Sequence, residues 1–210
     1  MPTEKQWRAA LEERHGRELR QRFSAATVAI CGLGGLGSNI AVALARAGVG
    51  RLILADFDRV DLTNLHRQQY KAAQIGRYKT EALAENLREI APYVKTDVFT
   101  GRIGEENAEK LLKEADIICE AFDGAESKAM LANCVLEKLP GCYLVAASGM
   151  AGMGTPNAIK TRQITRRFYL CGDGESDVAG TMGLVAPRVM LCAAHQAHTV
   201  LRILAGEFET

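Results

Sequence analysis

Three glycines near the start of the chain have the spacing of a phosphate-binding turn. Gly32, Gly34 and Gly37 follow the apolar residues 28–31 in a G-x-G-x-x-G pattern, and these apolar residues predict a buried strand. Glycine lets the backbone turn sharply and approach a phosphate closely, and free N–H groups at the start of a helix attract anions. The pattern therefore predicts that a phosphate group binds between this strand and a following helix.

A helix, a second strand and an acidic residue follow the glycines in the order of a nucleotide-binding βαβ unit. The apolar run 52–55 predicts the second strand, and Asp56 at its end is expected to accept hydrogen bonds from ribose hydroxyls. NAD and ATP both carry these hydroxyls, so the unit predicts a nucleotide without choosing between them. Apolar residues at helical intervals indicate the helix: Leu36, Ile40, Ala43, Leu44 and Ala47.

Cationic and amide side chains follow the second strand. Asn64, Arg67 and Gln68 lie in the polar segment 56–79, and Lys79 begins the next predicted helix. In an open parallel sheet such groups gather at the carboxyl edge of the strands, where ligands bind. Two cations would be unusual for a dinucleotide, but they suit a triphosphate, whose charge needs more than backbone amides. No GxxxxGK[ST] motif is present, so these cations would supply charge from outside the turn.

An acidic residue completes this set. Asp123 follows the predicted strand 117–120, so its carboxylate is expected at the same edge of the sheet. A carboxylate there can hold Mg²⁺ together with phosphate oxygens. The combination favours a Mg-ATP site.

These motifs resemble those of the ThiF/MoeB family, the adenylating enzymes related to ubiquitin-activating enzymes. The resemblance runs from about residue 14 to the end and includes GLGGLGS, DFD, NLHRQ, Lys79 and Asp123. The segments EAFD, SGMAG, YLCGDG and APRV are most similar to short ThiF-like proteins of thiamine biosynthesis. The resemblance implies Mg-ATP-dependent adenylation of the C-terminal glycine of a small ubiquitin-like sulfur carrier that ends in Gly-Gly, with ThiS as the nearest case.

The resemblance also implies roles for individual residues. Arg67 and Lys79 would act on the phosphates, and Asp123 would bind Mg²⁺. An arginine of the N-terminal helix would enter the site of a partner subunit in a homodimer; Arg14 matches best, with Arg17 as the alternative. The residues expected at the nucleotide are Gly32, Gly34, Gly35, Leu36, Gly37, Asp56, Asp58, Asn64, Arg67, Gln68 and Lys79.

The chain departs from the family pattern in three places. Larger members bind a structural zinc through two C-x-x-C pairs; none occurs among the six cysteines here, so no zinc is predicted. The segment GAESK places Lys128 where many relatives have an arginine. Cys171 stands at the start of a glycine-rich segment, 171–186, that predicts a mobile loop. Cys171 is either a structural residue or a cysteine that takes sulfur or forms an acyl link to the carrier.

The predicted fold is α/β: a Rossmann-like, doubly wound, mostly parallel sheet with helices on both faces, extended by a short antiparallel hairpin. One adenylation domain is expected over residues 1–210, with an N-terminal helix in 1–23, a nucleotide-binding core in 24–148, and a hairpin, loop and C-terminal helix in 149–210. The predicted helices cover 4–23, 79–91, 105–113, 125–138 and a segment starting at Pro187. Further strands are predicted at 94–99, 117–120, 143–147, 158–161 and 168–170.

Composition limits the alternatives. A length of 210 residues with 48% hydrophobic residues and a net charge of +1 suits one globular domain and gives no argument for a nucleic-acid or membrane partner. Without an apolar run long enough to span a membrane or a signal peptide, a cytoplasmic location is expected. The competing functions are a MoeB-like role in molybdopterin synthesis, a non-catalytic binding module, and an NAD-dependent oxidoreductase. The last leaves Arg67, Lys79 and Asp123 without a role.

Overall fold

The computed structural model describes residues 1–180 and 183–209. Within them, seven strands form one sheet in the order β3-β2-β1-β4-β5-β7-β6. All neighbouring strands are parallel except β6 and β7, which form an antiparallel hairpin at one edge. This arrangement confirms the Rossmann-like sheet and its hairpin. The strands are β1 (Thr27–Cys31), β2 (Arg51–Asp56), β3 (Lys95–Thr100), β4 (Ile117–Glu120), β5 (Tyr143–Ala147), β6 (Lys160–Thr165) and β7 (Phe168–Gly172).

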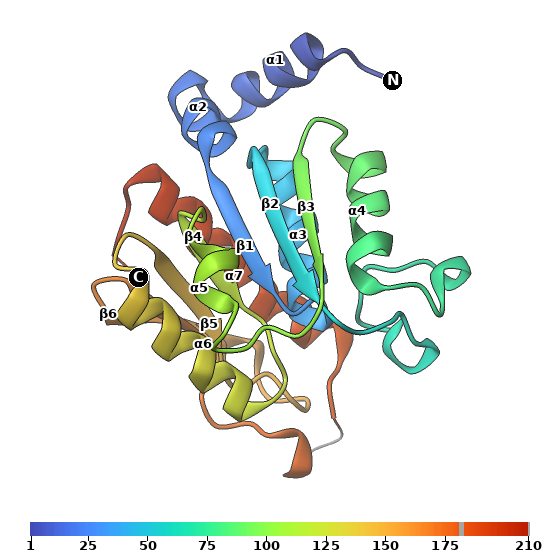
Figure 1. Cartoon of the computed structure of the whole chain (residues 1–210), viewed down its shortest axis with the longest axis vertical. Helices are drawn as coiled ribbons and strands as arrows, with labels where there is room; N and C mark the ends of the chain where they lie inside the picture. Colours follow the sequence, from blue (N-terminus) through green and yellow to red (C-terminus); the bar gives the residue numbers. More distant parts are fainter. Residues whose placement is uncertain (181–182, 210) are drawn as a thin grey trace.

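Helices cover both faces of the sheet (Figure 1). In β1, Val28 and Ile30 pack under α3, α4 and α7, whereas Ala29 and Cys31 pack under α5 and α6. No helix in the described ranges is long and apolar enough to cross a bilayer. The helices are α1 (Glu4–His15), α2 (Arg17–Ala25), α3 (Gly35–Ala47), α4 (Lys79–Ile90), α5 (Ala108–Leu112), α6 (Ala125–Lys138) and α7 (Ala186–Ala205).

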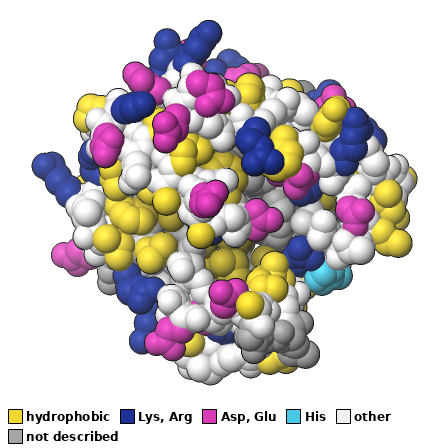
Figure 2. Space-filling view, turned by 60° about the horizontal axis from the view of Figure 1, so that its bottom comes forward, with side chains coloured by type: hydrophobic (Ala, Val, Ile, Leu, Met, Phe, Trp, Pro, Cys, Tyr) yellow, Lys and Arg dark blue, Asp and Glu magenta, His cyan; other side chains and the backbone are white. Residues whose placement is uncertain are grey.

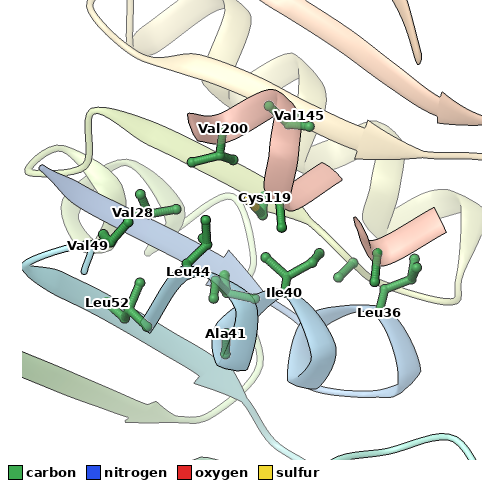
Figure 3. Close-up of a cluster of buried hydrophobic side chains, with 14 of the residues drawn as sticks. Val28, Leu36, Ile40, Ala41, Leu44, Val49, Leu52, Cys119, Val145 and Val200 are labelled. Carbon is green, nitrogen blue, oxygen red and sulfur yellow. The ribbon is translucent and has the colours of Figure 1, made fainter. Parts of the chain in front are cut away.

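The larger core holds α3 in place behind the predicted phosphate turn. Ile40 and Leu44 of α3 are fully buried in one cluster with Val28 of β1 and Val200 of α7 (Figure 3). A rigidly packed α3 fixes the position of its own first turn, which is where the sequence predicts phosphate binding. The core thus connects the apolar periodicity of the sequence to the geometry of the site.

The predicted N-terminal helix over 4–23 is wrong in one respect, because the structure has two helices. The Thr3–Gln6 capping box starts α1 as expected. Gly16, with φ 77°, then separates α1 from α2. Both helices lie at the amino ends of the strands, the opposite end of the sheet from the start of α3 (Figure 1). Arg14, exposed on α1, is therefore remote from the glycine turn of its own chain.

The hairpin and the segment before α7 also differ in detail from the prediction. A 3-10 turn at Pro156–Ala158 delays β6, which begins at Lys160. Residues 171 and 172 are part of β7 and not of a loop. The following residues are held by a buried ion pair between Asp173 and Arg188 (2.5 Å). The prediction of a mobile loop is therefore wrong at its start. Of the predicted loop, residues 181–182 lie outside the described residues.

Arg188, in the first turn of α7, joins several segments. Its guanidinium donates to the carbonyls of Ala151 (3.1 Å), Gly154 (2.8 Å) and Thr155 (3.0 Å) as well as to Asp173. Burial disfavours ionisation of Asp173, but hydrogen bonds from Ser176, Glu175 and Arg188 outweigh it and lower the pKa to about 2. The segment after β5 and the segment after β7 are thereby fixed to α7.

We predict that Asp173→Asn destabilises the fold near neutral pH by about 3 kcal/mol, because it leaves the buried Arg188 charge without a counter-ion. A carboxylate with a lowered pKa stabilises the fold above the pKa of the unfolded side chain, near 4, and this contribution is lost as the pH falls toward about 2. The stability difference from wild type should therefore shrink between about pH 4 and pH 2. Urea denaturation at several pH values measures it, and a difference independent of pH contradicts this role of the pair.

Candidate nucleotide site

The glycine turn depends on close backbone contacts. Gly32 has φ 91°, and a Cβ on it would lie 2.6 Å from the carbonyl oxygen of Ala121 in the turn after β4. A Cβ on Gly37 would lie 1.8 Å from the carbonyl oxygen of Gly32. Gly34 is the N-cap of α3, and because glycine has no side chain it accepts no side-chain hydrogen bond from the first N–H groups of the helix. The N–H groups of the first turn of α3 therefore remain available to an anion, as the sequence predicts.

Asp56 connects the end of β2 to the glycine turn. Its Oδ2 accepts a hydrogen bond from the Leu33 N–H (2.6 Å), and its Oδ1 accepts one from the Asp58 N–H (2.7 Å). The side chain is buried at the edge of the sheet. Each carboxylate oxygen has a further lone pair that can accept a hydrogen bond from a hydroxyl. The position agrees with the expected ribose contact, which itself stays a prediction.

The NLHRQ turn, residues 64–68, is attached to α3 beside the glycines. The Asn39 side chain donates to the Arg67 carbonyl (3.1 Å), and the Ser38 hydroxyl accepts from the Gln69 N–H (3.1 Å). The Arg67 side chain crosses the start of α3, since a Cβ on Gly35 would lie 3.5 Å from its Cγ and Cδ. Ser38 and Asn39 were not singled out from the sequence, although they directly follow the glycines in GLGSN.

Two polar atoms of this turn are buried without a partner. They are Nε of Arg67 and Oε1 of Gln68, and no described residue forms a hydrogen bond with either. The Asn64 side chain accepts a 2.9 Å hydrogen bond from Nη2 of Arg67 and forms no hydrogen bond with the Nε of the same guanidinium. Burial also lowers the pKa of Arg67. Because buried polar atoms normally have partners, these two atoms indicate a missing polar ligand next to the phosphate turn.

Lys79 and Asp58 form a half-buried ion pair at the same edge. The Lys79 Nζ lies 2.8 Å from the Asp58 Oδ2, and 5% of the lysine side chain and 49% of the aspartate side chain are exposed. The Lys79 N–H also donates to the Asp58 carbonyl (3.0 Å). The structure therefore brings Lys79, the first residue of α4, to the segment that leaves β2. Its cation is already compensated by one carboxylate.

Asp123 lies in the turn after β4, which packs against the glycine turn. The Ala121 N–H donates to the Cys31 carbonyl (2.8 Å), and Phe122 contacts the position that a Cβ on Gly32 would take. The Asp123 side chain is exposed and forms no hydrogen bond or ion pair with any described residue. In the described ranges no group of three or more His, Cys, Asp or Glu is placed to hold a metal alone. A single carboxylate suffices for Mg²⁺ when phosphate oxygens supply other ligands.

The residues gathered here lie at the carboxyl ends of β1, β2 and β4, which meet at one end of the molecule, or, for Lys79, at the start of α4 (Figure 1). Figure 2 turns this end forward and shows a hollow bordered by acidic and basic side chains. The structure thus brings together the glycine turn and four predicted site residues, namely Asp56, Arg67, Lys79 and Asp123. Arg14 does not lie near them.

Cys171 is not placed for chemistry with a partner protein. It lies within β7 and is fully buried, and the Thr161 hydroxyl is within hydrogen-bond distance (3.5 Å) of its sulfur. Burial raises the pKa of the thiol and outweighs the hydrogen bonds from Thr161 and Thr199. A raised pKa disfavours the thiolate, which is the reactive form of cysteine. The expected position at the start of a mobile loop is wrong, and the geometry favours the structural interpretation.

Sequence reasoning missed the groups that hold the Asp123 turn. Glu120, the last residue of β4, forms a buried ion pair with Lys128 of α6 (3.0 Å). Gln196 of α7 donates to the carbonyls of Glu120 (3.0 Å) and Val145 (3.1 Å). The sequence offers two signals for this arrangement, the acid at the end of an apolar run in EAFD and the lysine in GAESK, but neither shows that the two side chains meet.

The fold and the site are those expected of an α/β protein that binds a nucleotide with cations from outside the phosphate turn. Comparison with known families then identifies the group: residues 8–210 match the ThiF family, and the chain belongs to it. This confirms the resemblance noted in the sequence.

Individual relatives differ in what their names describe. The chain is 35% identical, over 92% of its length, to the adenylyltransferase and sulfurtransferase uba4 of Pyricularia oryzae, and spans 44% of that protein. It is 31% identical, over 72% of its length, to a tRNA threonylcarbamoyladenosine dehydratase of Escherichia coli, and spans 57% of it. Neither name refers to thiamine biosynthesis.

A solved structure matches nearly the whole fold. The structure is the dehydratase TcdA from E. coli in complex with ATP, with a TM-score of 0.84 over 97% of this chain and 95% of that one. The two sequences are 24% identical, so the likeness concerns the fold.

We predict that Gly37→Ala destabilises the protein by about 3 kcal/mol or more, because its Cβ would overlap the Gly32 carbonyl and force the backbone apart. Gly34→Ala is the matched control, since its Cβ would meet only the Gln68 side chain at 3.7 Å, an ordinary contact. Thermal denaturation followed by circular dichroism compares them. Equal melting temperatures would show that the turn is looser than described.

Proposed function

We propose that this protein is an adenylyltransferase that uses Mg-ATP to activate a carboxylate, forming an acyl-adenylate and releasing pyrophosphate. The observation that carries the proposal is the group of polar side chains without partners around the uncapped start of α3. Arg67 Nε, Gln68 Oε1 and the Asp123 carboxylate all lack partners among the described residues, and all belong to turns that contact the glycines. Such a site fits a polyanion with an associated cation.

Each part of the site has a chemical task in this reaction. The N–H groups of the glycine turn would hold phosphate oxygens, Asp56 the ribose, and Asp123 the Mg²⁺. Bound Mg-ATP would supply the electrophilic phosphorus and the pyrophosphate leaving group. Arg67 and Lys79 would offset the negative charge that develops on the phosphates. For this, Lys79 has to share its ammonium between Asp58 and the nucleotide.

No activated nucleophile is required from the protein. The attacking group is a carboxylate, which is ionised near neutral pH, so the site has only to align two anions and reduce their repulsion. Substrate positioning and charge compensation therefore account for catalysis, and no buried cysteine or histidine has to take part.

The proposed acceptor is the C-terminal glycine of a small ubiquitin-like sulfur carrier. The support is the similarity to relatives named adenylyltransferase and sulfurtransferase, of which this chain spans less than half. A ThiS-like carrier of thiamine biosynthesis and a MoeB-like role in molybdopterin synthesis are the two finer proposals. A cytoplasmic location and a homodimer are proposed with them.

A second candidate follows from the dehydratase relative. Its name refers to loss of water from threonylcarbamoyladenosine in tRNA, and a threonine moiety carries a carboxylate that adenylation would activate. The same site could therefore serve either acceptor. The net charge of +1 favours the protein carrier, because RNA-binding domains usually carry a clear excess of basic residues.

We predict that the protein catalyses ATP–pyrophosphate exchange in the presence of its carrier, and that Arg67→Ala, Lys79→Ala and Asp123→Ala each lower the rate by about 100-fold or more. Arg166→Ala, which removes an exposed arginine from the β6–β7 turn, should leave the rate unchanged. The assay uses each small Gly-Gly-ended protein of the host in turn, and unmodified and threonylcarbamoylated tRNA in parallel. Exchange with tRNA alone would replace the carrier by the second candidate. No exchange with any acceptor would refute the activity.

The proposed role of Arg14 in a partner subunit has its own test. We expect Arg14→Ala and Asp123→Ala each to be inactive alone, and their mixture to recover roughly a quarter of wild-type activity, because mixed dimers keep one intact site. Subunit exchange is confirmed by mass spectrometry of the mixture. A mixture that stays inactive after exchange excludes a contribution of Arg14 in trans, and Arg17→Ala then tests the alternative arginine.

A further inference from the structure

A buried ion pair closes the carboxyl end of β4, directly before the turn with Asp123. Only 2% of the Glu120 side chain and 28% of the Lys128 side chain are exposed. The Lys128 Nζ lies 3.0 Å from each carboxylate oxygen of Glu120 and 3.1 Å from the Ala147 carbonyl oxygen. An ammonium group has three N–H donors, so these three acceptors can use all of them.

The pair joins the ends of neighbouring strands to a helix. Glu120 ends β4, Ala147 ends β5, and Lys128 lies near the start of α6. Gln196 of α7 adds a second bridge, because its amide donates to the carbonyls of Glu120 and Val145. Four elements therefore meet where the chain leaves the sheet to form the Asp123 turn.

The turn is attached to the ion pair at its start, and its end is fixed by the backbone of α6. At its start, the Phe122 N–H donates to the Glu120 Oε1 (2.7 Å). At its end, the backbone N–H of Lys128 donates to the Gly124 carbonyl (3.1 Å), a hydrogen bond of α6 that does not involve the lysine side chain. Asp123 lies between these attachments, and its own carboxylate is exposed and has no partner among the described residues. Its direction therefore depends on the backbone that carries it.

Energetics suggest that the pair does more than stabilise the fold. Burial raises the pKa of Glu120, and the charge and hydrogen bonds of Lys128 act in the opposite direction. A buried ion pair often adds no net stability over apolar residues of the same volume, whereas removal of one partner is costly. Two apolar side chains at these positions could not form the hydrogen bond from Lys128 to the Ala147 carbonyl. They also could not fix the direction in which the backbone leaves β4 to form the turn.

We propose that Lys128 is a positioning residue: through Glu120 it holds the turn so that Asp123 stays at the edge of the glycine turn, where it can ligate the magnesium of Mg-ATP. This role rests on the proposed function, since it requires a metal-bound nucleotide at the glycines. It predicts that the magnesium-dependent part of the ATP affinity depends on Lys128, whose ammonium is held by Glu120 and the Ala147 carbonyl, whereas the affinity for metal-free ATP does not.

The test compares variants by isothermal titration with ATP, once with Mg²⁺ and once with EDTA. Lys128→Met should weaken Mg-ATP binding by about tenfold or more, the effect usual for groups that orient metal ligands, and change metal-free ATP binding by less than about twofold. Lys128→Arg, which keeps the charge and donors, should retain most of the Mg²⁺-dependent gain. Lys138→Met, an exposed lysine at the end of the same helix, is the matched control.

A double variant separates positioning from stability. In Glu120→Gln/Lys128→Met no unpaired charge is buried, so its melting temperature should recover relative to Lys128→Met, whereas the Mg²⁺-dependent gain should stay lost. If Lys128→Met does not fold, the double variant alone decides. Recovery of the gain in the double variant, or an equal loss with and without Mg²⁺, overturns the positioning role. Wild-type protein that binds ATP in neither form overturns the proposed function and this role with it.

Discussion

The contact between Gly32 and the Ala121 carbonyl is the constraint on which the candidate site depends. With a side chain on residue 32, the turns after β1 and β4 could not approach each other at this distance. The approach sets the glycine turn beside the turn that carries Asp123. The segments after β2 are attached to the same glycine turn, through Asp56 on Leu33 and through the residues that follow Gly37. The site is thus an assembly of three strand ends around one backbone contact.

Polar groups at this edge fall into two kinds. Asp56, Glu120 and Arg188 are buried, and each is satisfied by backbone groups of neighbouring turns. These residues give the edge its shape. The Nε of Arg67 and the Oε1 of Gln68 are buried beside the same turn and lack partners. Because burial of an unpaired polar atom is costly, the two unpaired atoms beside the glycine turn fit groups that face a ligand.

Much of this architecture is predictable from local sequence signals. Residues 117–120, 125–138 and 143–147 form the predicted elements, because apolar periodicity and the Pro140-Gly141 turn mark them locally. The break at Gly16 is not predictable in this way, since helical periodicity continues across it and a single glycine is tolerated within a helix. The partners of Glu120 and Arg188 were also missed. Those contacts join residues from separate elements, and no single stretch of sequence shows which side chains will meet.

The burial of the cysteines has a consequence for how sulfur could reach a carrier. All six thiols lie inside the protein, in strands or under helices, and none is oxidised to a disulfide. An adenylated carrier bound here would therefore meet no accessible thiol on the described residues, and its sulfur would have to come from a group outside them. Activation and sulfur delivery would then be distinct steps at different groups. The lifetime of the acyl-adenylate would limit how efficiently the two are coupled.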